Sequence, residues 1–538
     1  MNAQLLGLTK RFMASTIDLD ALIARADFDE TDSNAGASQG GSAKDRLEAR
    51  DLQLGEYLFS VLRKPDFQRE TNEWDVYKII DLIRCFLAGD VIPAVILWRA
   101  KTGLMYVIDG SHRLSALAAW VNDDYGEGAI SKLFYDGIIQ QEQQDLGQEV
   151  RVAINKAIGS YADHRLALSH PDKVKEQVVN QSRALAIQTI PMQIVRGDSV
   201  KAEASFRKIN EQGVALDPTE KKILDGRKTP RGIAARAIIK GGKGYNYWSN
   251  FEADAQTKLK DSAREISDLL YLPKYANPVK TLDLPIAGKV NASYSLTLVW
   301  DFIGIVHPPA EKEEQDNKDG QLTLDFLTKC RKVAQRILSV HLSSLGLHPI
   351  VYTYSLNGRH KPASFYAIVD LVIKLNEKPN GFVTFSKVRQ NLETLLIEND
   401  YIIPQIVRHN RGAHASYQNI TKFYLACIEK LSSGMAIETV VTEIGKMTEF
   451  AFLSKPIAVI DAPSSPDFSA ATKSYAYIKS ALQGVPKCPF CHGYLHVNGI
   501  TTDHIKDVSE GGQANAANAQ PSHPYCNSTL KSILASES

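Results

Sequence analysis

Four residues near the C-terminus have the side chains and the spacing of zinc ligands. Cys488 and Cys491 are separated by two residues, and His523 and Cys526 repeat that spacing downstream. Thiolates and imidazoles bind zinc tetrahedrally, and each pair can reach a single ion. Because four protein ligands leave no position for water, we expect a structural zinc that stabilises a C-terminal domain too small for a large core. The alternative, two buried cysteines and a surface histidine, is disfavoured because the spacing occurs twice.

A set of polar residues lies between and beside these two pairs. It comprises Asp503, His504, Gly511-Gly512, Asn518 and Asn527. With the zinc pairs around it, this pattern resembles the HNH endonuclease family, whose core is a hairpin followed by a helix, the ββα-metal fold. The resemblance implies that His504 is a general base and that Asp503 and Asn527 bind a catalytic Mg2+ or Mn2+ ion. It also implies that Asn518 holds the loop that orients His504.

The expected chemistry is hydrolysis of a phosphodiester bond. Such a reaction needs an activated water and a cation that neutralises the charge developing on the phosphate. Histidine suits the base because much of it is neutral near pH 7. Taken alone, Asp503-His504 would be read as a turn with a surface histidine. Its position between the zinc pairs favours the nuclease interpretation.

A second block near the N-terminus predicts a site for phosphate. A helix is expected over 74–87, followed by strands over 94–98 and 104–108. The second strand runs into Asp109-Gly110-Ser111-His112-Arg113 and another helix. A glycine turn between a strand and a helix N-terminus presents backbone N–H groups that can bind phosphate. His112 and Arg113 would add positive donors, and Asp109 would cap the helix or hold a metal ion.

This N-terminal block resembles the ParB/sulfiredoxin-like domain with a DGQQR or DGQHR motif, as in the GmrSD and SspE modification-dependent restriction proteins. The stretch 206–220 carries the further Phe..Ile-Asn..Gly..Leu...Glu pattern of those domains. The resemblance implies binding, and possible hydrolysis, of a nucleotide such as ATP or GTP. The residues so implicated are Gln68, Arg69, Asp109, Gly110, Ser111, His112, Arg113 and Asn210. Ser111 departs from both forms of the motif and His112 fits only the second form, so whether the nucleotide is hydrolysed stays open. The alternative interpretation of Asp109-Gly110 is a tight turn that caps the helix.

Composition and charge limit how the protein can bind DNA and where in the cell it is expected. The net charge of +1 gives no global attraction to DNA, so contacts must come from local basic segments such as 227–231, 357–361 and 408–414. Each of these could equally be a solvated loop. The glycine-lysine run 240–244 lacks the Walker spacing and is expected to be a loop. Three further cysteines are scattered, and neither a signal peptide nor a membrane-length apolar run is apparent, which predicts a cytoplasmic protein.

The expected fold class is α+β, divided by linkers. We expect an N-terminal helix and flexible linker over 1–45, a ParB-like mixed α/β domain over 46–249 and a helical scaffold or sensor over 250–460. A hinge over 461–470 would precede the zinc-stapled HNH domain over 471–538.

Two functions compete at this stage. The first is an anti-phage restriction endonuclease whose HNH domain cuts double-stranded DNA, directed to modified DNA and regulated by a nucleotide. Because an HNH domain has one metal centre, a double-strand break would need two passes or a homo-oligomer. The second is a DNA-binding ParB-like protein whose zinc module is a non-catalytic knuckle. Asp503, His504 and Asn527 favour the first, because a pure knuckle does not need them.

Overall fold

The structure is a computed structural model of the whole chain, and it forms two compact units. It describes residues 17–28, 44–66, 68, 74–135, 137, 139, 141–185, 187–212, 222–223, 225–290, 294–308, 317, 319–454 and 467–537. The first unit consists of 1–228, 243–249 and 291–293, and the second of 229–242, 250–290 and 294–538.

The first unit is built on a six-stranded mixed sheet with strand order β1-β3-β5-β4-β6-β2. The strands are β1 (Arg25–Ala26), β2 (Arg46–Leu47), β3 (Leu62–Pro65), β4 (Val95–Arg99), β5 (Met105–Asp109) and β6 (Ile190–Val195). β4 runs antiparallel to β5 and parallel to β6. Its helices are α1 (Tyr57–Val61), α2 (Val76–Ala88), α3 (Ser111–Asn122), α4 (Ala129–Phe134), α5 (Gln141–Ala157), α6 (Tyr161–Ser169), α7 (Glu176–Leu185) and α8 (Ser199–Gln212).

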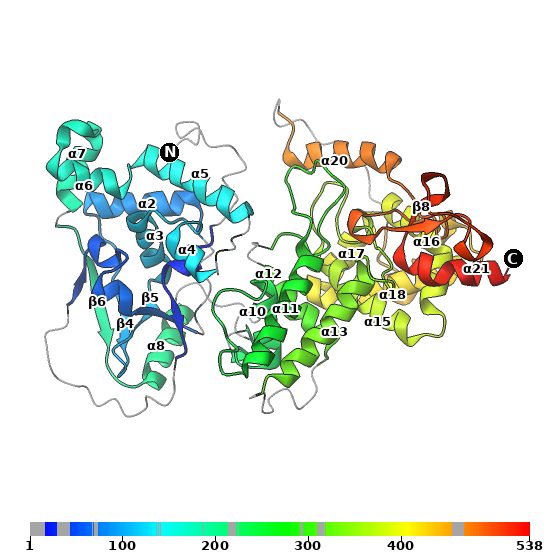
Figure 1. Ribbon diagram of the computed structural model, residues 1–538, viewed down its shortest axis with the longest axis horizontal. Helices are drawn as coiled ribbons and strands as arrows, with labels where there is room; N and C mark the ends of the chain where they lie inside the picture. Colours follow the sequence, from blue (N-terminus) through cyan, green and yellow to red (C-terminus); the bar gives the residue numbers. More distant parts are fainter. Residues whose placement is uncertain are drawn as a thin grey trace. The chain divides into compact units, whose positions relative to one another are not determined.

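Side chains alternate between the two faces of this sheet, and each face is covered by helices. Leu97 and Val107 join α2 and α3 in the main hydrophobic core. Trp98, Tyr106 and Ile108 belong to a separate cluster on the opposite face, with Phe206 of α8. In Figure 1 α8 lies on the other side of the strands from α2 and α3. The sheet therefore holds the turn after β5 in a fixed position between two packed layers.

The helix predicted over 74–87 and the strands predicted over 94–98 and 104–108 are confirmed to within about two residues as α2, β4 and β5. The N-terminal helix predicted within 1–45 lies mostly outside the described residues, and residues 17–28 form a 3-10 turn and the strand β1. Asp75 caps α2, its side chain accepting a hydrogen bond from the Lys78 backbone N–H at 2.9 Å. Gly89 ends the helix in the left-handed conformation, with φ of 77°. The predicted apolar face of the helix is buried against the core.

The second unit is helical at its centre. It contains α10 (Pro230–Ile239), α11 (Ala253–Tyr271), α12 (Ser295–Val306), α13 (Gln321–Ile337), α14 (Pro349–Tyr352), α15 (Pro362–Glu377), α16 (Gly381–Glu398), α17 (Ile402–Asn410), α18 (Ala413–Ser432), α19 (Ile437–Ile444) and α20 (Ala470–Ala481). The chain then forms the antiparallel hairpin of β7 (Thr501–His504) and β8 (Ala519–Ser522), a π-helical turn (Cys526–Leu530) and α21 (Lys531–Glu537).

The C-terminal hairpin and helix pack onto the helical region and belong to the same unit. The Tyr525 backbone N–H donates to the Ser344 carbonyl at 2.9 Å, and the π-helical turn lies against α16 (Figure 1). The compact units therefore differ from the predicted scheme, which separated 250–460 from 471–538. α10, expected in the N-terminal domain, is part of the second unit because its apolar side chains pack against α11, α12 and α13. The predicted hinge 461–470 lies largely outside the described residues.

Candidate active site and metal centre

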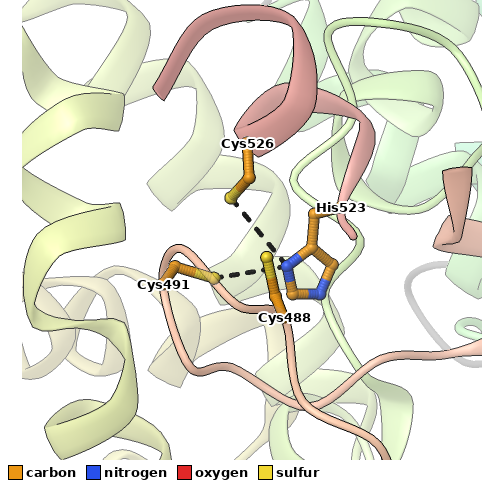
Figure 2. Close-up of side chains that lie close together, drawn as sticks. All are labelled: Cys488, Cys491, His523 and Cys526. Atoms are coloured by element: carbon orange, nitrogen blue, oxygen red, sulfur yellow. Dashed lines mark hydrogen bonds between the residues drawn. The ribbon is translucent and has the colours of Figure 1, made fainter. Parts of the chain in front are cut away.

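The four predicted zinc ligands converge on one point. The ligand atoms of Cys488, Cys491, His523 and Cys526 all lie within 4.8 Å of one another, and all four residues are buried. Figure 2 shows the two sulfurs of the first pair on a turn and the second pair at the start of the C-terminal helix. The turn is tight: the Cys488 N–H donates to the Gly493 carbonyl, and the His492 N–H donates to the Cys488 carbonyl, each at 2.9 Å. This set of three sulfurs and one imidazole could bind zinc.

The orientation of His523 suits a metal ligand. Its Nδ1 lies 3.3 Å from the Cys491 sulfur and 4.0 Å from the Cys526 sulfur, and its Nε2 lies 3.0 Å from the Tyr494 carbonyl oxygen (Figure 2). A proton on Nε2 would donate to that carbonyl and leave Nδ1 free to bind. Burial and the neighbouring Arg389 cation lower the pKa of His523, which favours the neutral imidazole that metals require.

The hairpin places Asp503 inside the domain. Asp503 faces Gln520 across the two strands and is buried. Its Oδ2 accepts a hydrogen bond from Gln520 Nε2 at 2.8 Å, and its Oδ1 lies 3.0 Å from the ammonium of Lys531. Asp503 is therefore held by one neutral and one cationic donor.

Lys531 is a site residue that the sequence analysis missed. Its Nζ also donates to the His504 carbonyl at 2.8 Å and to Asp507 Oδ1 at 2.7 Å. Partial burial lowers the pKa of Lys531, but the hydrogen bonds to Asp507 and Asp503 outweigh this, so its pKa lies above the ordinary value. The available signal was its position four residues after Asn527, a spacing that places helical side chains on one face.

Asn518 clamps the loop that follows His504. Its Oδ1 accepts from the Lys506 N–H at 2.7 Å, and its Nδ2 donates to the carbonyls of Lys506 and Gln513 at 3.0 and 2.9 Å. Gly512 is required here, because a Cβ at this position would lie 1.8 Å from the Lys506 carbonyl oxygen. The half-buried His504 lies at the end of β7, directly before this loop.

Asn527 lies on the π-helical turn that follows the second zinc pair. Its Nδ2 is 3.4 Å from both the Thr501 Oγ1 and the Thr502 carbonyl, so its side chain reaches β7 just before Asp503. Single π-helical turns occur frequently at functional sites. Of the two predicted metal ligands, Asp503 therefore lies in β7, and Asn527 reaches β7 from the π-helical turn.

In the first unit, most of the predicted nucleotide-site residues line one cavity of about 500 Å³. Gly110 stands at the N-terminus of α3 with φ of 96°, and a Cβ there would lie 2.7 Å from Val95, so glycine is required on both counts. The cavity is lined by Gln68, Asp109, Gly110, Ser111, His112 and Arg113, and also by Trp74, Lys78 and Phe206. Arg69 lies outside the described residues, as does the side chain of Asn210 on α8.

The side chains in this cavity are less free than the sequence suggested. Arg113 pairs with Asp109 at 2.6 Å and donates to the Pro93 and Ala94 carbonyls, so its guanidinium is already engaged within the protein. The His112 ring stacks on Trp74 at 6.0 Å between ring centres. The Oε1 of Gln68, by contrast, is buried and has no hydrogen-bond partner among the residues that the structure describes. Lys78 is an exposed cation at the cavity that the sequence analysis did not single out.

Both the N-terminal domain and the C-terminal hairpin-and-helix region match models of known protein families. Residues 51–224 match the model of the GmrSD restriction endonuclease N-terminal domain, and residues 488–532 match that of the HNH endonuclease. The chain joins a GmrSD N-terminal domain to an HNH endonuclease domain. No curated protein and no solved structure matches the chain. The HNH match contains the four zinc-type residues and Asp503, His504, Asn518, Asn527 and Lys531.

The basic segments proposed as DNA contacts are partly turned inward. Arg227 is buried and pairs with Asp66 at 3.3 Å, and Arg231 stacks over Trp300 at 4.4 Å. Lys361 pairs with Asp400 at 2.8 Å, and His409 stacks on Phe452. In the segment 227–231 both arginines therefore have structural partners, which disfavours it as a DNA contact. Among the described residues, no helix is both long and apolar enough to cross a bilayer.

Proposed function

We propose that this protein is a DNA endonuclease of restriction type, in which the HNH domain hydrolyses one phosphodiester bond per catalytic event. The observation that carries the proposal is the hairpin-and-helix arrangement that brings His504, Asp503 and Asn527 to one strand beside a four-ligand zinc-type cluster. The two family matches support the same conclusion.

The donors near β7 fit a divalent cation such as Mg2+ or Mn2+. Asp503 offers a carboxylate and Asn527 an amide oxygen, and hard divalent ions prefer oxygen ligands. Asp503 Oδ1 lies 3.0 Å from the ammonium of Lys531, so this buried carboxylate has a cationic partner in the protein itself. When bound, such an ion would supply charge neutralisation at the phosphate and the leaving oxygen.

In the proposed reaction His504 takes a proton from the attacking water at an imidazole nitrogen. Backbone hydrogen bonds on both sides of His504 hold it in position. The His504 carbonyl accepts a hydrogen bond from Lys531, and the Ile505 N–H donates to the Asn518 carbonyl at 2.9 Å. A base that is held before substrate arrives costs less reorganisation in the transition state.

The test of the nuclease is plasmid nicking in Mg2+ or Mn2+ by the wild type and by His504→Ala, with zinc content measured in both. We expect cutting by the wild type and its loss in His504→Ala, with zinc retained. A wild type that binds DNA but cuts none, modified or not, would favour a DNA-binding protein with a non-catalytic knuckle.

We further propose that the GmrSD N-terminal domain binds a nucleotide in its cavity and regulates cutting of modified phage DNA. The Gln68 Oε1, which has no hydrogen-bond partner within the described part of the chain, and the N-terminus of α3 supply an acceptor and backbone donors for such a ligand. Calorimetry with ATP and GTP on wild type and Gln68→Leu tests binding. Cleavage of matched modified and unmodified phage DNA, with and without nucleotide, tests regulation and targeting. Equal cutting under all conditions would remove the regulatory role and leave the nuclease.

A further inference from the structure

A cavity of about 680 Å³ lies in the helical region of the second unit. It is formed by the C-terminal part of α13, the end of α15, the start of α16 and the loop after α13. α13 and α15 lie side by side (Figure 1). Its charged lining is predominantly basic, with Arg331, Lys332 and Arg336 against one acidic residue, Glu377, and His341 also lines it. Because the chain as a whole has a net charge of +1, this is a local concentration of positive charge.

The cations of this cavity are ordered to different degrees. Arg336 is held rigidly, because its Nη1 donates to the Ser343 carbonyl at 2.7 Å and its guanidinium lies over the Phe382 ring at 4.5 Å. Arg331 is partly neutralised by Glu265 at 3.2 Å. Lys332 lines the cavity and is exposed to solvent. An exposed lysine beside partly buried arginines gives the cavity a positive charge that suits a polyanion.

The loop beside the cavity exposes apolar side chains. Val340 is 65% exposed and Leu342 is 67% exposed, and they flank His341. Exposed aliphatic side chains next to cations can contact the sugars and bases of a nucleic acid while the cations contact its phosphates.

This loop is bonded directly to the turn that carries Asn527. Ser528 Oγ donates to the Leu342 carbonyl at 2.9 Å, and the Tyr525 N–H donates to the Ser344 carbonyl. Gly346 approaches the knuckle so closely that a Cβ there would lie 2.5 Å from the His523 ring. A ligand on the loop would therefore stand in a fixed relation to the HNH site.

We propose that this basic cavity and the loop 338–343 form the DNA-binding surface that holds the duplex against the HNH domain, with the exposed Lys332 on the phosphodiester backbone, the engaged Arg336 adding positive charge to the cavity, and Leu342 on the sugar and base edges. The inference rests on the proposed nuclease function and goes beyond it by naming where the substrate is held. The charge complementarity to a polyanion and the direct bonds to the turn bearing Asn527 carry it.

The test is fluorescence anisotropy of a labelled DNA duplex with the full chain carrying His504→Ala, so that binding is measured without cutting. Lys332→Glu is expected to weaken binding about three- to tenfold and to reduce the salt dependence by about one phosphate contact. Leu342→Ser is expected to weaken binding with little change in salt dependence. Lys473→Glu, a matched reversal of an exposed lysine on α20 that does not line the cavity, is expected to bind as the parent does.

The same substitutions in the active enzyme separate this inference from the nuclease function. If the wild type cuts DNA and Lys332→Glu binds and cuts as well as Lys473→Glu does, the surface is not the DNA site and serves another partner, while the nuclease stands. If the wild type neither cuts nor binds DNA, the nuclease proposal fails and this inference fails with it. Thermal unfolding of each variant checks that the fold is retained.

Discussion

Arg389 of α16 forms a buried ion pair beneath the zinc knuckle, and its replacement tests how the helical region supports the HNH domain. Its Nε lies 2.6 Å from Glu393 Oε1, and the side chains of the two residues are 1% and 2% exposed. Arg389 also donates to the Leu345 and Gly346 carbonyls, and its Nη1 lies 3.3 Å from His523 Nδ1. Glu393 in turn accepts from the Tyr494 N–H at 2.8 Å.

The expected cost of Arg389→Met follows from this burial. Removing one member of a buried ion pair leaves an uncompensated charge, which destabilises by about 3–5 kcal/mol. Glu393 would keep the Tyr494 N–H and the Tyr352 hydroxyl as donors, so we expect the lower half of that range. For a unit of this size, the melting temperature should fall by roughly 5–10 °C. We also expect faster loss of zinc to a chelator, because the loop at Leu345 and Gly346 loses its anchor.

Thermal unfolding and zinc-release kinetics measure these effects, and a double-mutant cycle isolates the pair. Arg389→Met combined with Glu393→Leu should be less destabilised than the sum of the single variants, since no charge is then left buried. Lys374→Met is the matched control: it breaks another pair four residues apart, with Asp370 at 2.7 Å, but a more exposed one, and should cost less than about 1 kcal/mol. The reasoning is refuted if Arg389→Met costs no more than Lys374→Met, or if the cycle shows no coupling.

Three further predictions concern the metal, the active site and pH. Cys491→Ser, or removal of zinc from the wild type followed by resupply of Mg2+ or Mn2+, should abolish DNA cutting and melt the hairpin β7–β8 first, as followed by hydrogen exchange. Cutting that survives complete zinc removal would contradict a structural metal. Lys531→Met should lower the cleavage rate about ten- to a hundredfold with zinc retained, because Asp503 and the His504 carbonyl lose the donor that they share. Lys531→Arg should recover part of the cleavage rate. An unchanged rate for Lys531→Met at saturating Mg2+ or Mn2+ would exclude a role for Lys531 in positioning the site. Burial lowers the pKa of Lys64 from 10.5 to about 8, so between these pH values the unfolded chain binds a proton that the folded chain does not, and this group adds roughly 3 kcal/mol of stability to the first unit as pH rises. Buried tyrosines of the same unit, such as Tyr125 and Tyr245, have raised pKa values and act in the opposite direction near pH 10, so the predicted quantity is the difference in stability between the wild type and Lys64→Met, which should grow with pH from about 7.5 to about 10.5. Equal slopes for the two proteins in calorimetric unfolding would overturn the prediction.

Features set by local spacing could be predicted from the chain alone. The helix at Val76–Ala88 follows from its apolar period, the Asp75 cap and Gly89. The two zinc-type pairs follow from two-residue spacings, because a short turn brings both side chains of a pair to one point whatever surrounds it. The role of Asn518 was implied by the family resemblance, and its side chain bonds to backbone groups 5 and 12 residues away.

Features made by residues far apart in the sequence could not be predicted. Arg389 and Glu393 are four residues apart, but the residues that they contact are distant in the sequence. Leu345 and His523 lie 44 and 134 residues from Arg389, and Tyr494 lies 101 residues from Glu393. No periodicity in the sequence encodes such contacts. The inward turn of Arg227 onto Asp66 is another case, since a basic residue in a loop-like segment has the same sequence signature whether it faces solvent or a buried carboxylate.

The chain by itself therefore determined which chemistry is available: a sulfur and imidazole cluster, an Asp-His dipeptide with two asparagines, and a glycine turn at a helix N-terminus. These depend on residue type and short-range spacing, which the sequence states directly. Only the tertiary structure decided that Lys531 holds Asp503, that Arg113 is engaged by Asp109 and carbonyls, and that a basic cavity is bonded to the turn bearing Asn527. Those outcomes depend on which surfaces pack together, and packing is decided by the whole chain at once.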